Sequence, residues 1–289
     1  MLGTMTPRPL ALSPSRASDY QSCPLKYRLR TIDKIPEPTT EAQVKGTLVH
    51  AVLEEMFAWP RDARTFPAAV KRIKPTWAAM CEKDPSCAEP IDDEMTLFRD
   101  ARDLLRGYFH MENPLGFDAH EQEMYVNTVL PNGVPVRGFI DRVDIAPTGE
   151  VRVVDYKTGK KPLPRYSQDA QFQMRFYALV YWRLFETIPT QLRLMYLKVM
   201  DSMFLAPSRE ELEYFERDLG ELWAKIEADG KEGRFRPKRS KLCGWCAFQD
   251  LCPEFGGTPP EYPGWPGSAA DGNTPPAPGA AGSHDPDRT

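Results

Sequence analysis

Several signals that assign a chain to a broad class are missing from these 289 residues. No apolar run approaches the length that spans a membrane, and the N-terminus lacks the charged-then-apolar pattern of a secretion signal, so we expect a cytoplasmic protein with no membrane partner. A Walker-type phosphate loop is absent, because Thr158-Gly-Lys-Lys161 lacks the earlier glycine and the following Ser or Thr, so the chain brings no ATP motor of its own. Positive charge is not in excess either, since the net charge of −4 argues against a uniformly basic nucleic-acid binder.

The composition that remains is that of an ordinary globular chain, with 41% hydrophobic and 27% charged residues. We expect a flexible Pro-rich N-terminus over residues 1–11 and one main domain over 12–255, which includes a helical insertion at 60–115 and a basic loop with a cysteine cluster at 231–253. Residues 256–289 are rich in Pro, Gly, Ala and Ser without periodic apolar residues, which predicts a disordered tail.

Two adjacent stretches, 138–145 and 150–160, alternate apolar and polar residues around turn-forming residues, which predicts a β-hairpin. Side chains two apart on a strand point the same way, so Asp155 and Lys157 share a face. A suitable register sets Asp141 of the partner strand close to Asp155. Two carboxylates and an ammonium that converge in this way form an arrangement that holds a divalent metal ion and its water.

Other acids near this hairpin receive structural interpretations. Asp144 lies three residues from Asp141, so we expect it on the opposite strand face as a partner of Arg142 or Arg152. Glu121 and Glu123 precede the hairpin on another expected strand, and we interpret both as solvent-facing.

Helical periodicity predicts helices over residues 41–57, 67–83, 91–111 and 167–185. Gly46 and His50 in the first of these are four apart and share a face, so the missing side chain leaves room beside the imidazole. Gln173 and Tyr177 lie one turn apart on the last.

Six cysteines in a reducing compartment indicate metal or thiol chemistry before disulfides. Cys243, Cys246 and Cys252 fall within ten residues, too close for a sensible disulfide pattern. Cys81 and Cys87 have no neighbouring ligand pair and are interpreted as free thiols. Beside the trio, Arg236, Lys238, Arg239 and Lys241 form either a solvated loop or a surface that follows a phosphate backbone.

In combination these motifs resemble the RecB-like exonuclease branch of the PD-(D/E)XK nuclease superfamily. The resemblance rests on the N-terminal signature over 13–27, Gly-x-x-x-His at Gly46, the wording Gly-x-Ile-Asp-Arg-Val-Asp then Val-Asp-Tyr-Lys-Thr-Gly-Lys, and Gln-x-x-x-Tyr at Gln173. It covers roughly Leu12 to Pro253 and implies an α/β fold with a restriction-endonuclease-like core, a central mixed sheet flanked by helices.

The resemblance also implies a metal-dependent DNA nuclease, most simply an exonuclease in DNA repair or recombination. The implied ligands of Mg²⁺ or Mn²⁺ are His50, Asp141, Asp155 and the backbone carbonyl of Tyr156. The implied catalytic residues are Asp141, Asp155, Lys157, Gln173 and Tyr177. Many relatives carry an acid on the strand before the hairpin, to which Glu121 or Glu123 loosely corresponds, although we favour the solvent-facing interpretation of both.

Some members of the resembled family hold a [4Fe-4S] cluster with one N-terminal cysteine and a C-terminal trio, which implies Cys23 together with Cys243, Cys246 and Cys252. A structural Zn²⁺ is the alternative, because four thiolates suit either metal.

The implied partner is DNA, single-stranded or with free ends, and a helicase acting in trans can supply such ends. Two alternatives stay open: a CRISPR-associated spacer-processing nuclease, and a catalytically inactive DNA-binding module. Against the inactive module, none of His50, Asp141, Asp155 and Lys157 has been lost.

Overall fold

A computed structural model describes residues 10–163 and 167–267 of the chain. The strands are β1 (Glu121–Val129), β2 (Pro135–Ile145), β3 (Val151–Lys157), β4 (Gln191–Tyr196) and β5 (Asp201–Leu205). The α-helices are α1 (Pro14–Ser22), α2 (Pro24–Tyr27), α3 (Glu41–Phe57), α4 (Phe66–Lys83), α5 (Glu94–Met111), α6 (Gln168–Phe185) and α7 (Arg209–Glu232). Short helical turns are η1 (Arg28–Ile32), η2 (Arg61–Ala63), η3 (Pro85–Ala88), η4 (Pro114–Gly116), η6 (Lys241–Trp245), η7 (Gln249–Leu251) and η8 (Pro253–Phe255).

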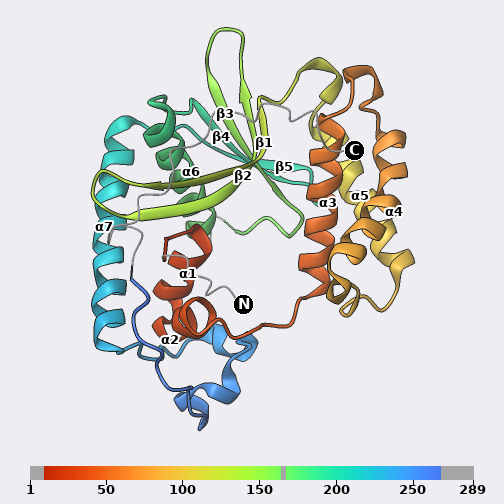
Figure 1. The fold of residues 1–289 in the computed structure, drawn as a ribbon. Coiled ribbons are helices and arrows are strands. Elements are labelled where there is room, and N and C mark those ends of the chain that lie inside the picture. The colour runs from red at the N-terminus through yellow and green to blue at the C-terminus, as the bar shows by residue number, and fades with distance from the viewer. Residues whose placement is uncertain (1–9, 164–166, 268–289) are drawn as a thin grey trace, which may run out of the picture.

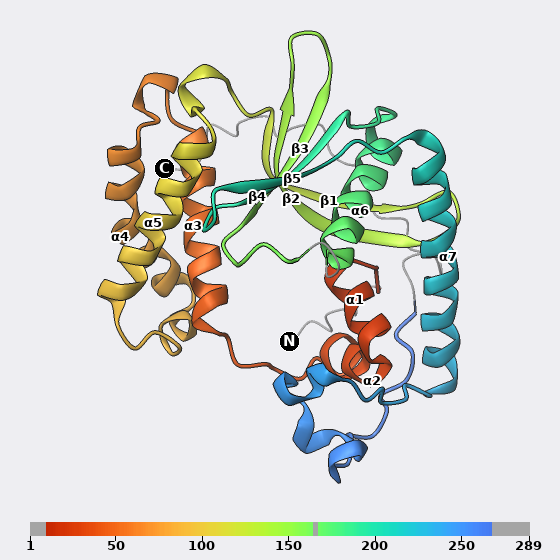
Figure 2. The same cartoon turned by 180° about the vertical axis from the view of Figure 1, so that it is seen from behind.

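The five strands form one mixed sheet in the order β1-β2-β3-β4-β5, in which β3 and β4 run parallel and the other neighbours antiparallel. Helices α3, α4 and α5 lie to one side of this sheet, and α1, α6 and α7 lie to the other (Figures 1 and 2). The predicted fold class, an α/β PD-(D/E)XK-like core with a mixed sheet flanked by helices, is confirmed.

Capping residues fix where the long helices begin. Thr40 and Gln43 form a reciprocal capping box at the start of α3, and Ser208 and Glu211 form another at the start of α7. Helix α7 ends at Gly233, whose φ of 66° is a left-handed conformation that favours glycine.

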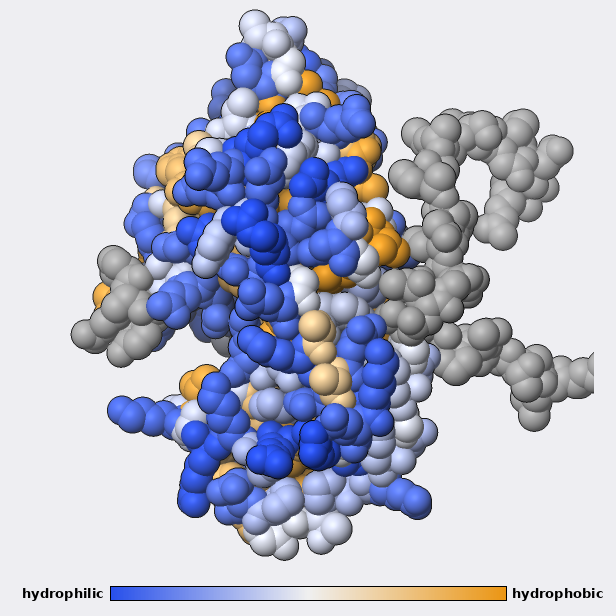
Figure 3. Space-filling model, turned by 90° about the vertical axis from the view of Figure 1, so that its left-hand side faces the viewer, coloured by the Kyte–Doolittle hydropathy of each residue, from blue (hydrophilic) through white to orange (hydrophobic). Residues whose placement is uncertain are grey.

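Each side of the sheet has its own hydrophobic core. The main core packs α1, α6 and α7 against β1 to β4, and the second packs α3, α4 and α5 against β3 and β4. The outer side of α7 belongs to the face seen in Figure 3, where hydrophilic residues predominate. Within the described ranges, no helix combines the length and the apolar character that crossing a membrane requires.

A buried ionic network, here called the Arg142 cluster, connects the sheet to the second core. Its members are Arg142, Arg152 and Arg193 with Glu112 and Asp144. Arg142 is fully buried, with N to O distances of 2.8 Å to Glu112 and 3.0 Å to Asp144. Asp144 also lies 2.8 Å from Arg152, so its predicted role as an arginine partner is confirmed.

The prediction of a disordered tail is wrong over residues 256–267, which pack on the domain. The Tyr262 hydroxyl donates to the Gly230 carbonyl at 2.7 Å, and Trp265 packs against the main core. A Cβ on Gly230 would come within 2.1 Å of the Trp265 ring, so glycine permits this contact. The remainder of the expected tail, 268–289, lies outside the described residues.

The prediction of a flexible N-terminus over residues 1–11 is also wrong for residues 10 and 11, the part that the structure describes. Leu10 and Ala11 are buried, and the Leu12 amide donates to the Pro135 carbonyl at 2.7 Å, which places this segment beside β2. Residues 1–9 lie outside the described residues.

Replacing Arg142 with leucine should destabilise the fold by about 3–5 kcal/mol, because Glu112 and Asp144 would stay buried without their main counter-charge. Chemical denaturation measures this change. The matched control is Arg102→Leu on α5, where the arginine is exposed and pairs with the adjacent Asp103, and it should shift stability by less than about 0.5 kcal/mol. Equal effects of the two substitutions would contradict the central role of the cluster.

Candidate active site

The site forms where β2 and β3 separate. Arg142 and Val154 are the last paired residues of their ladder before the two strands part. One step further, the Tyr156 amide donates to Asp141 Oδ2 at 2.6 Å in place of a backbone carbonyl. The separation thus opens a gap at the sheet and aims the Asp141 carboxylate into it.

Helix α3 brings His50 to this gap. His50 Nε2 donates to the Tyr156 carbonyl at 2.9 Å, and Nδ1 lies 3.5 Å from Asp141 Oδ2. Gly46 allows the approach, because a Cβ there would lie 3.3 Å from Thr158 Oγ1. The room predicted beside the imidazole is therefore used by the end of β3, while His50 and Asp141 meet as predicted.

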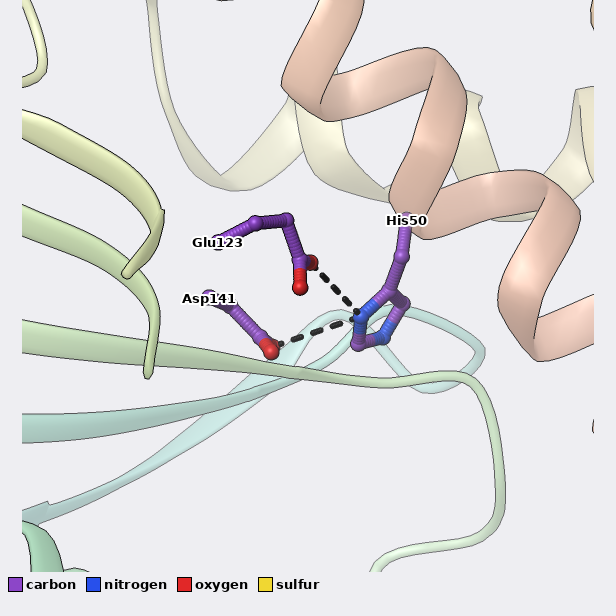
Figure 4. A group of neighbouring side chains, drawn as sticks. All are labelled: His50, Glu123 and Asp141. Carbon is purple, nitrogen blue, oxygen red and sulfur yellow. Dashed lines mark ion pairs between the residues drawn. The ribbon is translucent and has the colours of Figure 1, made fainter. Parts of the chain in front are cut away.

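Glu123 joins them from β1, and its prediction as solvent-facing is wrong. Its φ of 44° is a rare backbone conformation, and it interrupts the β1–β2 ladder between the pairs Gln122 with Arg142 and Met124 with Ile140. Its Oε1 lies 3.9 Å from His50 Nδ1 (Figure 4). The acid that relatives carry on this first strand was the available signal. Glu121, two residues earlier, is exposed as expected.

We call His50, Glu123 and Asp141 the His50 group. Each offers one ligand atom, and these three atoms lie within 4.8 Å of one another. They line a narrow recess between α3, β1 and β2 together with the Tyr156 side chain.

Asp155 and Lys157 face the other way, toward α6. Lys157 Nζ lies 2.7 Å from Asp155 Oδ2, which confirms that the two share a strand face. Gln173 joins them: its Nε2 donates to Asp155 Oδ1 at 2.7 Å, and its Oε1 accepts from Lys157 at 2.8 Å. The structure therefore brings Asp155 together with Lys157 and Gln173 and does not include its carboxylate in the His50 group.

Tyr177 lies one turn after Gln173 and is nearly buried. Its ring packs on Gly138 of β2, where a Cβ would lie 3.0 Å from Tyr177 Cε1. Burial, followed by the charge of Asp155, raises the pKa of Tyr177, so the hydroxyl keeps its proton at neutral pH.

Negative charge is crowded at this site. Burial, followed by repulsion from Asp141, raises the pKa of Glu123 to about 7 and that of Asp155 to about 6. Burial lowers the pKa of His50, but the hydrogen bond and charge of Asp141, with the charges of Asp155 and Glu123, outweigh it and raise this pKa to about 9. A site in which neighbouring carboxylates raise the pKa of Glu123 and Asp155 is one that a divalent cation would stabilise.

The four cysteines of the predicted cluster line one pocket of about 250 Å³ between α1, α2 and the C-terminal segment. Backbone amides of Lys238 and Ser240 donate to two of these sulfurs, Cys23 at 3.4 Å and Cys243 at 3.2 Å. Cys81 and Cys87 lie elsewhere, on α4 and η3, and are free as predicted, with sulfurs 3.1 Å apart.

Basic side chains surround the cysteine pocket. Arg236 and Lys241 are exposed and form no ion pair with any described residue. Lys238 donates to the Gln21 carbonyl at 2.9 Å, and Arg239 lies 5.7 Å from the centre of the Phe255 ring. Two of the four predicted DNA-binding residues are thus free for other contacts, and two help to hold the pocket rim.

The chain matches one family model and resembles several known proteins. Residues 11–253 match the family model of the PD-(D/E)XK nuclease superfamily. The chain is 29% identical over 199 residues to the Gene 69 protein of Mycobacterium phage D29, covering 58% of this chain and 67% of that protein. It is 24% identical over 297 residues to the Gene 69 protein of Mycobacterium phage L5, covering 88% and 100%.

A third relative is a subunit of the ATP-dependent helicase/deoxyribonuclease of Streptococcus equi subsp. zooepidemicus (strain H70), which is 25% identical over 162 residues. That alignment covers 53% of this chain but 14% of the much longer relative. Among solved structures, a "Putative exonuclease" from Eubacterium rectale has the same fold, with a TM-score of 0.54, 12% identity, and coverage of 82% of this chain and 86% of that one.

The raised pKa values predict how stability depends on pH when the site holds no metal. An acid with a raised pKa binds its proton more tightly in the folded state, so the Glu123 contribution is lost as pH rises from 4.5 through about 7. The His50 contribution, present below 6.5, is lost as pH rises through about 9. Denaturation of EDTA-treated protein should therefore show stability falling by on the order of a few kcal/mol across this window.

The control for this pH effect is a pair of matched substitutions. Glu123→Gln should flatten the part of the profile below neutral pH, whereas Glu121→Gln, on the exposed neighbour, should leave it unchanged. An unchanged profile in the Glu123 variant would contradict the crowding described here.

Proposed function

Because the chain belongs to the PD-(D/E)XK nuclease superfamily, we propose that it is a Mg²⁺- or Mn²⁺-dependent deoxyribonuclease that acts as an exonuclease on DNA. The observation that carries the proposal is the meeting of His50 and Asp141 at the Tyr156 peptide, with the Asp155 and Lys157 pair on the two residues next to it in β3. The name of the streptococcal relative, part of a helicase/deoxyribonuclease, supports DNA as the substrate.

The residues present fit a hard divalent cation, which binds carboxylate and carbonyl oxygens and accepts imidazole. His50 Nδ1 lies 3.5 Å from Asp141 Oδ2 and 3.9 Å from Glu123 Oε1. Neighbouring ligands in an octahedral shell are about 3 Å apart, so these atoms lie close to the separations that one ion requires. We assign the ligands as His50, Glu123, Asp141 and the Tyr156 carbonyl, with Asp155 as the further carboxylate.

Such a cation supplies a water of lowered pKa and a Lewis acid for a phosphate oxygen. The Lys157 ammonium lies at the edge of the site, where it offsets negative charge that develops on the phosphate in the transition state. Gln173 is a positioning residue, because its hydrogen bonds hold both Asp155 and Lys157. Tyr177 remains protonated and supports Gln173 from one turn away.

Basic residues near the cysteine pocket supply a second contact to DNA in this proposal. Arg236 and Lys241 would follow the phosphate backbone, with Lys238 and Arg239 beside them. Since the sequence contains no Walker motif, unwinding of a long duplex would fall to a helicase acting in trans, and the role proposed is in DNA repair or recombination.

Asp155→Ala and Lys157→Ala should each lower Mg²⁺- or Mn²⁺-dependent degradation of end-labelled DNA by at least about 100-fold while the melting temperature stays close to that of the parent protein. Lys160→Ala, on an exposed lysine just past the strand, is the matched control and should keep full activity. Retained activity in both Asp155 and Lys157 variants would favour the inactive DNA-binding module.

We further propose that Cys23, Cys243, Cys246 and Cys252 hold a [4Fe-4S] cluster. Four sulfurs around one zinc lie about 4 Å apart at bond lengths near 2.3 Å. Among the described residues, these cysteines do not form a group of ligand atoms as compact as the His50 group, whose atoms lie within 4.8 Å. The pocket of about 250 Å³ that they line suits the larger cluster, so Zn²⁺ is the second choice.

Cys243→Ser should remove the visible absorbance and the bound iron of purified protein and should lower stability first, with activity falling as a result. Ligands at Cys23 and Cys243 connect distant parts of the chain, and closing so long a loop is worth roughly 4–5 kcal/mol in the loop-entropy model. Cys81→Ser, outside the pocket, should change neither colour nor stability appreciably. Colourless parent protein that carries one zinc per chain would exclude the iron-sulfur cluster.

A further inference from the structure

An exposed pair of aromatic rings lies on the β1–β2 ladder next to the His50 group. Tyr125 and Phe139 are 52% and 54% exposed, although large aromatic side chains usually gain from burial. They are direct cross-strand partners, and their ring centroids lie 5.0 Å apart at an interplanar angle of 44°. No other residue is needed to place them, because the strand register sets the pair.

The pair belongs to the side of the ladder that the main core leaves open. Val136 and Ile140 of β2 are core residues, so Arg137, Phe139 and Asp141, which alternate with them, follow one another on the other side. Asp141 of the His50 group comes two residues after Phe139 along β2, a step of about 7 Å. The rings therefore begin one such step from the proposed metal.

One step further along β2, Arg137 is the next residue on this side, and its charge acts on Arg16 of α1. Neither is within ion-pair distance of a carboxylate in the described part of the chain; Arg16 donates to the Ala11 carbonyl at 2.7 Å. Burial and the charge of Arg137 lower the pKa of Arg16 to about 10, which indicates a place where an anion would be stabilising.

We propose that Tyr125 and Phe139 stack on unpaired bases of a single DNA strand beside the cleaved phosphate, and that Arg16 and Arg137 bind the next phosphate along that strand. The order Arg137, Phe139 and Asp141 along β2, from cation through ring to metal ligand, matches the alternation of phosphate and base in one extended strand. Paired bases inside a duplex do not offer their faces to side chains. The inference rests on the proposed nuclease function and adds a preference for single-stranded ends.

Phe204 and Tyr214 are also exposed but lack this combination. Phe204 and Tyr214 have arginines over their own rings, Arg193 at 5.5 Å and Arg217 at 5.3 Å. Tyr214, which is 60% exposed on α7, therefore serves as the control position.

Steady-state cleavage of an end-labelled single strand and of the same sequence in a blunt duplex, with Mn²⁺, tests the inference on the full chain. Tyr125→Ala and Phe139→Ala should each raise KM for the single strand by about 5- to 150-fold, the range for loss of one stacked base. Tyr125→Phe should restore the parent value, and Tyr214→Ala should match the parent. Thermal melting of each variant checks that the exposed substitutions leave the fold intact.

A substrate with abasic sites next to the cleaved phosphate gives the discriminating readout. This substrate should raise the KM of the parent protein as much as the alanine substitutions do. It should raise the KM of those variants no further, because ring and base act as one pair. Two results would overturn the stacking inference alone, provided that the parent enzyme cleaves DNA. One is an unchanged KM in both alanine variants, and the other is additive increases in KM when those variants act on the abasic strand. Parent protein that neither binds nor cleaves DNA would overturn the proposed function and this inference with it.

Discussion

The backbone and side chain of Tyr156 hold the site together. Its amide donates to Asp141, its carbonyl accepts from His50, and its hydroxyl accepts from Arg142 at 2.7 Å. One residue of β3 thereby fixes β2 and α3 at once. The arrangement is possible only because β2 and β3 part after the pair Arg142 and Val154, which leaves the Tyr156 amide without a ladder partner. A buried amide must find an acceptor, and here a carboxylate serves.

Local rules were enough for the part of the site that lies within one strand. Alternation along β3 puts Asp155 and Lys157 on one face, and the structure confirms it at 2.7 Å. Glu123 could not be found in this way. Its left-handed φ breaks the alternation of β1. The Glu123 carboxylate there lies beside His50, which is 73 positions earlier in the chain. Register and period describe regular strands, and the site is built where the strands stop being regular.

The C-terminal segment shows that composition, like strand periodicity, does not predict every local structure. Pro, Gly, Ala and Ser predict disorder because they offer little apolar surface, yet the Tyr262 and Trp265 rings pack on the domain and the Leu10 amide donates to the Gly267 carbonyl. The fit of Trp265 depends on the missing side chain of Gly230, which lies on α7. An average over a window cannot represent such a pair. The cysteine pocket is similar, because only the fold brings Cys23 beside the C-terminal trio.

Asp141 and Arg142 are adjacent on β2 but belong to two clusters with opposite excess charge. The Arg142 cluster sets three arginines against two carboxylates and is largely buried, and each of its charged groups lies within ion-pair distance of an opposite charge. The site one residue away sets three carboxylates, those of Glu123, Asp141 and Asp155, against one lysine and a histidine. Two clusters on the same strands thus experience similar burial but opposite electrostatics. The acid excess at the second is the charge that the proposed divalent cation would offset.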